Sequence, residues 1–401
     1  MPVDLEHALD AVQLAARTRA FIRDVVIPVE DSCGGVLAGD EGERTRRKLQ
    51  EAARDAGVFA PHAAVEYGGH GLDMRSRALV FEEAGYSLLG PIALNIAAPD
   101  EANIHMLERI ATPEQKERYL APLAAGAVRS CMAMTEPVPG AGSDPAALST
   151  TATKVSGGWQ LNGRKWFATG AAGAAFTIVF ARTSGEPGQL GGATMFLVDA
   201  GNPGQKLARP HIETLDQSLY GGHAEVHYED CFVPDEAVLG EADRGYEYAQ
   251  VRLDPARTTH CMRWLGIARR SSDIALAYAN ERQLFGSRLA DLGMAQQIIA
   301  DNEIDIAASR ALVLQACWEL DRGRPAAQSV SVAKTFVSEA VGRVVDRSLQ
   351  LCGSLGVSCD LLLSRYLREV RAFRIYDGPS ETHRWAIAKR AAKHARTSRD
   401  G

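Results

Sequence analysis

The 401-residue sequence predicts an α+β fold with a helical region first, a β region second and another helical region last. A capped helix start at Thr112-Pro113 indicates helices before residue 125, and short β-rich runs with turn residues between them fill the middle. An apolar stripe at three- and four-residue spacing over residues 332–345 indicates a long helix near the end. We therefore expect an N-terminal α-helical domain at 1–125, a middle β domain at 126–242 and a C-terminal helical domain at 243–401.

Two patterns define the N-terminal helices. Residues 44–56 are amphipathic and are followed by Gly57, so they predict one helix. Thr112 is a capping residue, Pro113 stands at the first helical position, and Gln115 can reach back to the cap. This second helix should run to a stop at Gly126.

The middle region is expected to form a sheet. Its strand candidates are residues 150–155, 159–161, 165–169, 176–181, 194–198 and 224–228. The Asn162-Gly163 pair predicts a hairpin turn inside this set. Val233-Pro234-Asp235 is expected to end the sheet.

The composition is that of a soluble globular protein, with 46% hydrophobic and 23% charged residues. A formal net charge of -6 disfavours nucleic acid and anionic membranes as partners. No run of about 18 apolar residues predicts a membrane span, and the N-terminus lacks a signal-peptide pattern. We expect a cytoplasmic protein.

The seven cysteines are scattered and form no C-x-x-C pair. This spacing disfavours a disulfide framework and a metal cluster, so we expect no metal. A reducing compartment fits this pattern.

One carboxylate stands on a turn near the C-terminus, in Asp377-Gly378-Pro379, between two long helix-like segments. A carboxylate fixed on a sharp turn is suited to remove a weakly acidic proton next to a carbonyl group. Asp-Gly-Pro is also an ordinary turn formula. Taken alone, the segment leaves both interpretations open.

Taken together, several segments resemble the acyl-CoA dehydrogenase family over nearly the whole chain. They are Glu114-Gln115-Lys116, Thr135-Glu136-Pro137, Gly140-Ala141-Gly142-Ser143-Asp144, Asn162-Gly163-x-Lys165, Val233-Pro234, Arg282-x-x-Phe285-Gly286, Gln350-x-x-Gly353 and Asp377-Gly378. Ala98-Pro99-Asp100 and Arg257-x-x-His260-Cys261-Met262-Arg263 resemble the branch of family members ten and eleven. The resemblance implies a middle β-barrel or sandwich domain and a C-terminal four-helix bundle.

The resemblance also implies FAD as the cofactor. It assigns to FAD the residues Met132, Ala133, Met134, Thr135, Gly142, Ser143, Trp166, Phe167, Thr169, Arg282, Phe285, Gln350, Gly353, Pro379 and Glu381. Phe167 matches the flavin-facing position better than its neighbour Trp166. From the residues alone, a flexible loop at 132–143 and ordinary core aromatics remain alternatives. Two extra residues, Val138 and Pro139, depart from the common family pattern.

Some of the FAD contacts are implied to come from a second subunit. In the family, Arg282, Phe285, Gln350 and Gly353 belong to the partner copy, which implies a homodimer or homotetramer. An Arg fork suits the FAD pyrophosphate, although a helix-surface arginine can also be merely solvated. Leu292-Gly293 stands where the family commonly has His-Gln.

The implied substrate is an acyl-CoA thioester, with Ser143, Asp254 and Arg257 on the CoA side and Tyr376 and Gly378 near the reacting group. An acid such as Asp254 in a first helical turn is also simply a good helix start. We expect His260 and Arg263 to have a packing role rather than a catalytic one.

The implied reaction is α,β-dehydrogenation in fatty acid metabolism. Asp377 would take the α-proton while hydride passes from the β-carbon to flavin N5. Burial is expected to raise the pKa of Asp377, and its backbone N–H to bind the thioester oxygen. Ala256 occupies the position where some relatives place the base, and it cannot act as one. Electron-transfer flavoprotein or a similar protein would take the electrons.

Two other functions remain open. Nitroalkane oxidases share the fold and use an Asp base, so a flavin oxidase acting on a small carbon acid is one alternative. The retained CoA-side residues disfavour it. A non-catalytic flavoprotein that binds a macromolecular partner is the other.

Overall fold

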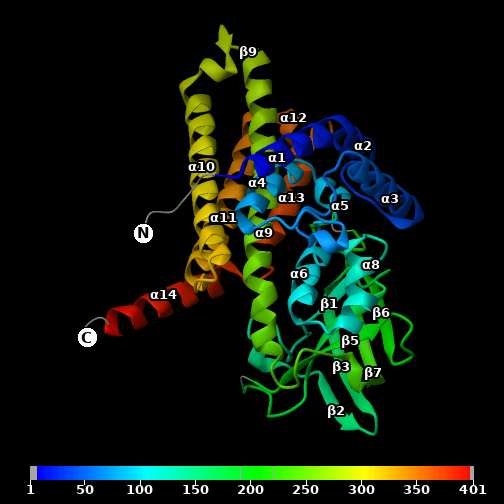
Figure 1. Ribbon diagram of the computed structural model, residues 1–401. Helices are drawn as coiled ribbons and strands as arrows, with labels where there is room; N and C mark the ends of the chain where they lie inside the picture. Colours follow the sequence, from blue (N-terminus) through cyan, green and yellow to red (C-terminus); the bar gives the residue numbers. More distant parts are fainter. Residues whose placement is uncertain (1–6, 190, 219, 398–401) are drawn as a thin grey trace.

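In the computed structural model, which describes residues 7–189, 191–218 and 220–397, a helical region, a mixed β sheet and a second helical region follow one another (Figure 1). This is the predicted order. The long helices of the second helical region pack side by side, and the sheet lies at one end of the molecule below the first helices.

The N-terminal helices share a buried apolar core and are joined to the sheet by several side chains, among them Asp100, Gln115 and Tyr119. The helices are α1 (Leu9–Phe21), α2 (Ile27–Cys33), α3 (Gly39–Asp55), α4 (Met74–Ala84), α5 (Gly90–Ala93), α6 (Asp100–Ile110), α7 (Pro113–Gln115) and α8 (Ala121–Ala124). The predicted cap is confirmed, because the Gln115 N–H donates to Thr112 Oγ1 at 3.2 Å and the Thr112 N–H to Gln115 Oε1 at 3.1 Å. Gln115 Nε2 then donates to the carbonyl oxygens of Glu236 and Val238, both at 2.9 Å.

The sheet contains eight strands in the described part of the chain, in the order β6-β7-β3-β2-β4-β5-β8, with β1 parallel to β4. They are β1 (Ser130–Ala133), β2 (Thr151–Val155), β3 (Gly158–Thr169), β4 (Phe176–Arg182), β5 (Ala193–Asp199), β6 (Gln205–Ile212), β7 (His223–Pro234) and β8 (Val238–Leu239). The sequence patterns did not predict β1, β6 or β8. The expected end of the sheet at residues 233–235 is therefore too early.

The predicted turn at Asn162-Gly163 is wrong, because β3 runs through these residues without a break. The chain turns earlier, at Gly157, where φ is +76°. Gly163 lies at a register shift against β7, and a Cβ there would come within 2.7 Å of Thr150 Cα. Asn162 Oδ1 accepts the Asp230 N–H at 2.9 Å. The Asn-Gly pair thus marks a β-bulge.

The second helical region is built on three long helices joined by a short hairpin and loops. Its elements are α9 (Gly245–Glu281), β9 (Gln283–Leu284), β10 (Ser287–Arg288), α10 (Gly293–Asp321), α11 (Ala327–Leu351), α12 (Ser354–Val357), α13 (Leu363–Phe373) and α14 (Ser380–Thr397). The predicted stripe of α11 is confirmed, with Val337, Val341, Val344 and Val345 at most 1% exposed. In Figure 1, α14 extends away from the body of the molecule. Among the described residues, no helix has the length and apolarity needed to cross a membrane.

One buried carboxylate joins the sheet region to the last helices. Glu369 on α13 accepts the backbone N–H groups of Gln217 and Ser218 at 2.9 and 3.0 Å, and the Ser218 hydroxyl at 2.7 Å. The segment between β6 and β7 is therefore docked on α13. Because α13 leads into the turn that carries Asp377, this contact sets the turn against the sheet.

Candidate active site

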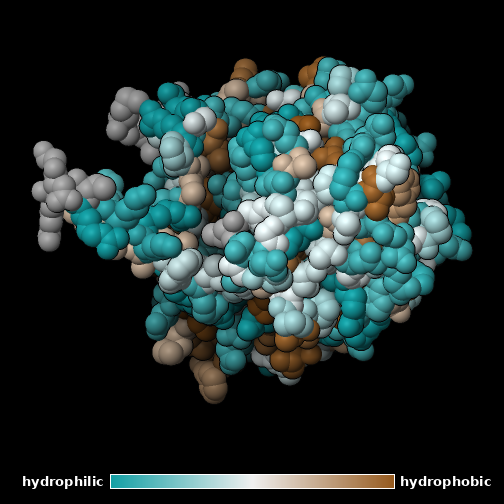
Figure 2. Space-filling model, turned by 90° about the horizontal axis from the view of Figure 1, so that it is seen from below, coloured by the Kyte–Doolittle hydropathy of each residue, from teal (hydrophilic) through white to brown (hydrophobic). Residues whose placement is uncertain are grey.

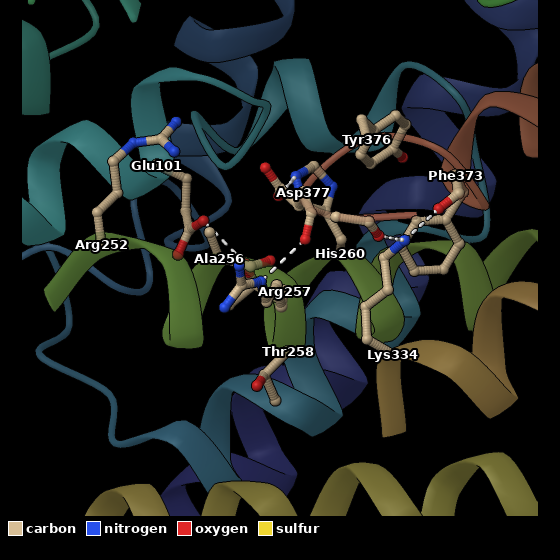
Figure 3. A network of polar contacts seen from close by, with 12 residues as sticks. Glu101, Arg252, Ala256, Arg257, Thr258, His260, Lys334, Phe373, Tyr376 and Asp377 are labelled. Carbon is tan, nitrogen blue, oxygen red and sulfur yellow. Dashed lines mark hydrogen bonds and ion pairs between the residues drawn. The ribbon is translucent and has the colours of Figure 1, made fainter. Parts of the chain in front are cut away.

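The turn that carries Asp377 has an unusual backbone that neighbouring side chains hold in place. Asp377 has φ +54° and Gly378 has φ +97°. Residues other than glycine rarely adopt such positive φ values. Lys334 on α11 donates from Nζ to the carbonyl oxygens of Phe373 at 2.7 Å and of Gly378 at 2.9 Å (Figure 3). One cation therefore clamps both ends of the turn.

Two further side chains hold the carbonyl group of Asp377 itself. Arg257 on α9 donates to it from Nε at 2.9 Å, and His383 on α14 from Nε2 at 3.1 Å. Because a carbonyl oxygen only accepts, His383 must carry a proton on Nε2. The turn is thus fixed from three helices, which explains the histidine of the Asp-Gly-Pro-x-Glu-x-His ending.

The Asp377 carboxylate contacts a histidine that we expected only to pack. Oδ2 lies 3.1 Å from His260 Nε2, and the aspartate side chain is 19% exposed. Burial acts to raise the pKa of Asp377, but His260 and then Arg252 and Arg257 outweigh it and lower the pKa. The expected rise in the pKa of Asp377 is therefore wrong. The carboxylate is ionised at neutral pH.

A network of buried charges lies behind this contact, where α6 meets α9. Glu101 is 1% exposed and accepts the Thr259 hydroxyl at 2.9 Å, with Arg263 NH1 3.6 Å away. Arg252 donates from Nε to Asn103 Oδ1 at 2.8 Å. Figure 3 shows Arg252 and Glu101 on the side of Asp377 opposite Lys334.

Two of the predicted flavin segments lie against each other. The segment 132–135 comprises the end of β1 and the two residues after it. The Trp166 N–H on β3 donates to the Thr135 carbonyl at 3.0 Å, and Lys165 Nζ donates to the Met134 carbonyl at 3.1 Å. Next to Trp166, Phe167 has φ +48° and is 43% exposed, so its ring is not part of the sheet's core.

The Thr-Glu-Pro and Asn-Gly-x-Lys motifs meet in a buried ion pair. Glu136 Oε1 lies 2.7 Å from Lys165 Nζ, and the two side chains are 1% and 0% exposed. Glu136 also accepts the backbone N–H groups of Ala141, Ser149 and Thr150 at 2.7–3.0 Å. Burial acts to raise the pKa of Glu136, but Lys165 and these donors lower it to about 2. These motif residues shape the loop that follows β1.

Thr169 at the end of β3 belongs to a second polar chain that the sequence did not reveal. His223 Nε2 lies 3.2 Å from Asp216 Oδ2, and Nδ1 lies 3.0 Å from Thr169 Oγ1. The Asp216 carboxylate can only accept, so the nearby His223 Nε2 carries a proton toward it. Phe167 packs edge-on against the His223 ring, with the centroids 6.0 Å apart.

The Asp377 turn is linked to the sheet by polar side chains on two sides. Arg252, whose charge lowers the pKa of Asp377, donates to Asn103, and Asn103 Nδ2 donates to Ser130 Oγ of β1 at 2.9 Å. On the other side, Glu369 on α13, the helix before the turn, holds the segment that leads into β7. The turn is therefore tied to the sheet that carries the predicted flavin strands.

Four other predicted FAD residues lie far from this region in the same chain. Arg282 follows the last residue of α9, about 22 positions after His260, which corresponds to about 33 Å at helical rise. Phe285, on the hairpin beyond it, is 92% exposed. Gln350 and Gly353, at the end of α11, are also exposed. The structure does not place these residues near their own Asp377.

The remaining predicted residues surround the turn or lie on the open loop. Gly142, Ser143 and Glu381 are exposed, whereas Pro379 and Gly378 are half-buried. Asp254 Oδ1 accepts from Arg257 NH1 at 2.9 Å. The Tyr376 hydroxyl accepts the Trp264 indole N–H, and the Tyr376 ring packs 4.9 Å from that of His260, so its side chain supports the turn. The extra residue Val138 is 90% exposed.

Replacing Lys334, which clamps the turn, should destabilise the protein. Lys334→Met leaves the carbonyl groups of Phe373 and Gly378 without their donor, and we expect a loss of about 1–3 kcal/mol in the free energy of unfolding. Chemical denaturation measures it. As a control, Lys154→Met removes a half-exposed surface pair with Asp235 and should cost about 1 kcal/mol or less. Equal stability of Lys334→Met and the unmodified protein would contradict the clamp.

Comparisons with known proteins agree with this architecture. Family models described as the N-terminal, middle and C-terminal domains of acyl-CoA dehydrogenase match residues 10–127, 131–231 and 243–392. A probable acyl-CoA dehydrogenase, FadE2, of Mycobacterium tuberculosis is 35% identical over 85% of this chain and 84% of its own length. Acyl-CoA dehydrogenase family member 11 of Gallus gallus is 32% identical over 94% of this chain, which spans 50% of that relative's length.

Solved structures give the same result. The structure of a putative acyl-CoA dehydrogenase from Mycobacterium abscessus is 32% identical, with a TM-score of 0.89 and 97% of this chain and 100% of that chain covered. Butyryl-CoA dehydrogenase from Megasphaera elsdenii is 26% identical, with a TM-score of 0.85 and the same coverage. With three family models covering most of its length, the chain belongs to the acyl-CoA dehydrogenase family.

Proposed function

We propose that this protein is an FAD-dependent acyl-CoA dehydrogenase in which Asp377 removes the α-proton of a CoA thioester. The observation that carries the proposal is the Asp377 carboxylate, which is ionised and held on a clamped turn whose preceding helix is docked on the sheet region. Ala256, one turn before His260, has no group that could act as a base. The proposed base is therefore this one carboxylate.

The same residue offers a donor for the charge that develops on the substrate. The backbone N–H of Asp377 donates to no other described residue. As the α-proton leaves, negative charge moves to the thioester oxygen, and a preorganised N–H stabilises it. Having base and donor on one residue lets the clamps that fix the turn orient both groups.

The residues present fit FAD. Phe167 offers a half-exposed aromatic ring, and the backbone N–H groups of Gly142 and Ser143 on an exposed loop donate to no described residue. Open N–H groups and a small residue let main chain approach a phosphate closely. We infer that these residues, with the segment 132–135, Trp166 and Thr169, hold the cofactor. When bound, FAD accepts the hydride from the substrate β-carbon.

Arg282, Phe285, Gln350 and Gly353 would complete the FAD site of a second copy, because they lie too far from their own Asp377. We therefore propose a homodimer or a homotetramer as the working form. Large hydrophobic side chains are exposed along the second helical region, on both the hairpin and the turn side: Phe285, Met294, Ile304, Ile375 and Trp385. Figure 2 shows hydrophobic patches on an otherwise mostly hydrophilic face. Electrons would then pass to electron-transfer flavoprotein or a similar acceptor.

The pyrophosphate contact gives a direct test of the shared site. Arg282→Ala should weaken FAD binding by about 10- to 100-fold, because it removes a charge-assisted contact worth roughly 1.5–3 kcal/mol. Titration of the apoprotein with FAD measures the affinity. Arg288→Ala on the same hairpin, where Arg288 pairs with Asp291, is the control and should leave affinity unchanged. Unchanged affinity of Arg282→Ala would contradict the assignment.

Turnover of a panel of CoA thioesters with an artificial electron acceptor tests the function itself. We expect loss of two hydrogens from at least one acyl-CoA with the dye as acceptor, and slow turnover with oxygen. Nitroalkanes serve as the competing substrates. Fast oxygen-dependent oxidation of a nitroalkane, with no acyl-CoA turned over, would overturn the proposal in favour of an oxidase.

A further inference from the structure

We propose that His260 is a positioning residue for Asp377, and that its Nε2–H group holds the carboxylate in the orientation needed to accept a proton. His260 is 9% exposed on α9, and its Nε2 lies 3.1 Å from Asp377 Oδ2. This inference deepens the proposed function and rests on it for its catalytic consequence. The contact between the two side chains can also be tested without turnover.

The neighbour on the other side of the ring determines which nitrogen carries the proton. Arg263 NH2 lies 2.8 Å from His260 Nδ1. A guanidinium group can only donate, so Nδ1 must supply a lone pair, and the ring proton lies on Nε2. Nε2 lies 3.1 Å from the Asp377 carboxylate oxygen Oδ2. Arg263 is itself held, because NH1 donates to the Ile96 carbonyl at 2.9 Å.

His260 acts on Asp377 as a neutral donor. Burial and then the charge of Arg263 lower the pKa of His260 below its usual value. The ring therefore stays neutral at physiological pH and has one N–H to give. A neutral donor steers the carboxylate without neutralising its charge.

The contact is short, but the direction of Nε2–H does not meet hydrogen-bond geometry, so Oδ2 has no hydrogen-bond partner among the described residues. Catalytic hydrogen bonds are often poorly aligned before the substrate binds and tighten in the complex. Oδ2 is also buried, so it has no water-exposed surface of its own. A small rotation of the carboxylate would align it with Nε2–H.

Other charged and titratable groups face Asp377 from each element packed on it. They are Arg252, Arg257 and Cys261 on α9, Lys334 on α11, Tyr376 on the turn itself and His383 on α14, with Glu101 on α6 behind His260 and Glu381 on α14 acting on Lys334. Arg257 and His383 bond the Asp377 carbonyl, and Lys334 bonds the neighbouring carbonyls. The carboxylate oxygen Oδ2 has its close contact with His260.

The first experiment compares pH profiles of kcat/KM for His260→Leu and His260→Gln. Asp377 must be ionised to take a proton, so activity falls as pH drops through its pKa. Leucine removes the donor, and the acid limb should move up by about 1 to 2 pH units, as expected for one hydrogen bond to a charged group. Glutamine keeps an N–H and should restore most of the original profile. An unmoved acid limb in His260→Leu would overturn the proposal.

His105→Leu is the matched control. His105 on α6 is also buried, with Nδ1 2.8 Å from an arginine of its own helix, Arg109, but it does not contact Asp377. The acid limb of the kcat/KM profile of His105→Leu should stay in place. A shift as large as that of His260→Leu would show that loss of a buried histidine alone moves the profile, and would overturn the proposal.

A second readout separates this inference from the proposed function. In pH-difference infrared spectra, the carboxylic-acid band that Asp377→Asn removes marks protonation of Asp377. We expect this band to appear at higher pH in His260→Leu than in the unmodified protein, whether or not any acyl-CoA is a substrate. A band that moves without acyl-CoA turnover would uphold the contact and reject the proposed reaction. A band that does not move would reject the contact.

Discussion

Asp377→Asn is expected to reduce the rate of flavin reduction by a CoA thioester about 10²- to 10⁴-fold, the usual contribution of a general base. Asparagine has nearly the same shape and can be held by the same turn, but it cannot accept the α-proton. Lys334, Arg257 and His383 bond backbone carbonyls, so they should still clamp the turn. Anaerobic stopped-flow absorbance at the flavin band measures the rate.

The variant should stay yellow, because the substitution is isosteric. Asp360→Asn, an exposed aspartate in the same region of the chain, is the control and should bleach at the unmodified rate. Complete bleaching of Asp377→Asn at that rate would mean that another group takes the proton.

Glu136→Gln is expected to lower the free energy of unfolding by about 3–5 kcal/mol, the usual cost of breaking a buried ion pair. The change leaves Lys165 buried without its counter-charge. It also turns an amide N–H₂ toward backbone donors that now face a carboxylate. Chemical denaturation of the holoprotein measures the loss.

This pair also predicts how stability depends on acid. The pKa of Glu136 is about 2 in the folded protein and 4.5 in its reference state, so folding favours the ionised form. The resulting stabilisation is complete above about pH 5 and is lost as pH falls toward 2. Glu136→Gln should lack this part of the acid dependence.

Glu229→Gln provides the matched surface control, since Glu229 pairs with Lys206 and both side chains are more than half exposed. It should leave the free energy of unfolding nearly unchanged, because the pair is screened by solvent. An equally small loss for Glu136→Gln, with an unchanged acid profile, would show that the buried pair does not stabilise the loop.

Local patterns predicted the parts of the fold that depend on local chemistry. The cap at Thr112 and the apolar stripe of α11 are properties of neighbouring residues, and both are confirmed. Strand β6 was missed because six of its eight residues are exposed, polar and apolar alike, so it lacks the alternation that marks a strand. Asn162-Gly163 has turn chemistry, but contacts with Thr150 and Asp230 from elsewhere in the chain make it a bulge.

In the candidate site, too, local sequence patterns revealed some residues, whereas contacts between distant parts of the chain determine others. The carboxylate on its turn could be found from the sequence, because Asp377 and Gly378 are adjacent. The role of Lys334 could not be found from the sequence, although a lysine within the apolar face of α11 indicates a buried partner for its charge. His260 meets Asp377 across 117 positions of sequence, and a single sequence does not tell which helix faces meet. The residues assigned to FAD and to CoA stay predictions.

Proton removal can be measured separately from the rest of the reaction. An acyl-CoA whose β-carbon carries no hydrogen, such as 3,3-dimethylbutyryl-CoA, can lose an α-proton but cannot be dehydrogenated. In D₂O, the unmodified protein should exchange its α-hydrogens for deuterium, seen by mass spectrometry, and Asp377→Asn should not. Exchange at equal rates in both proteins would contradict the role of Asp377.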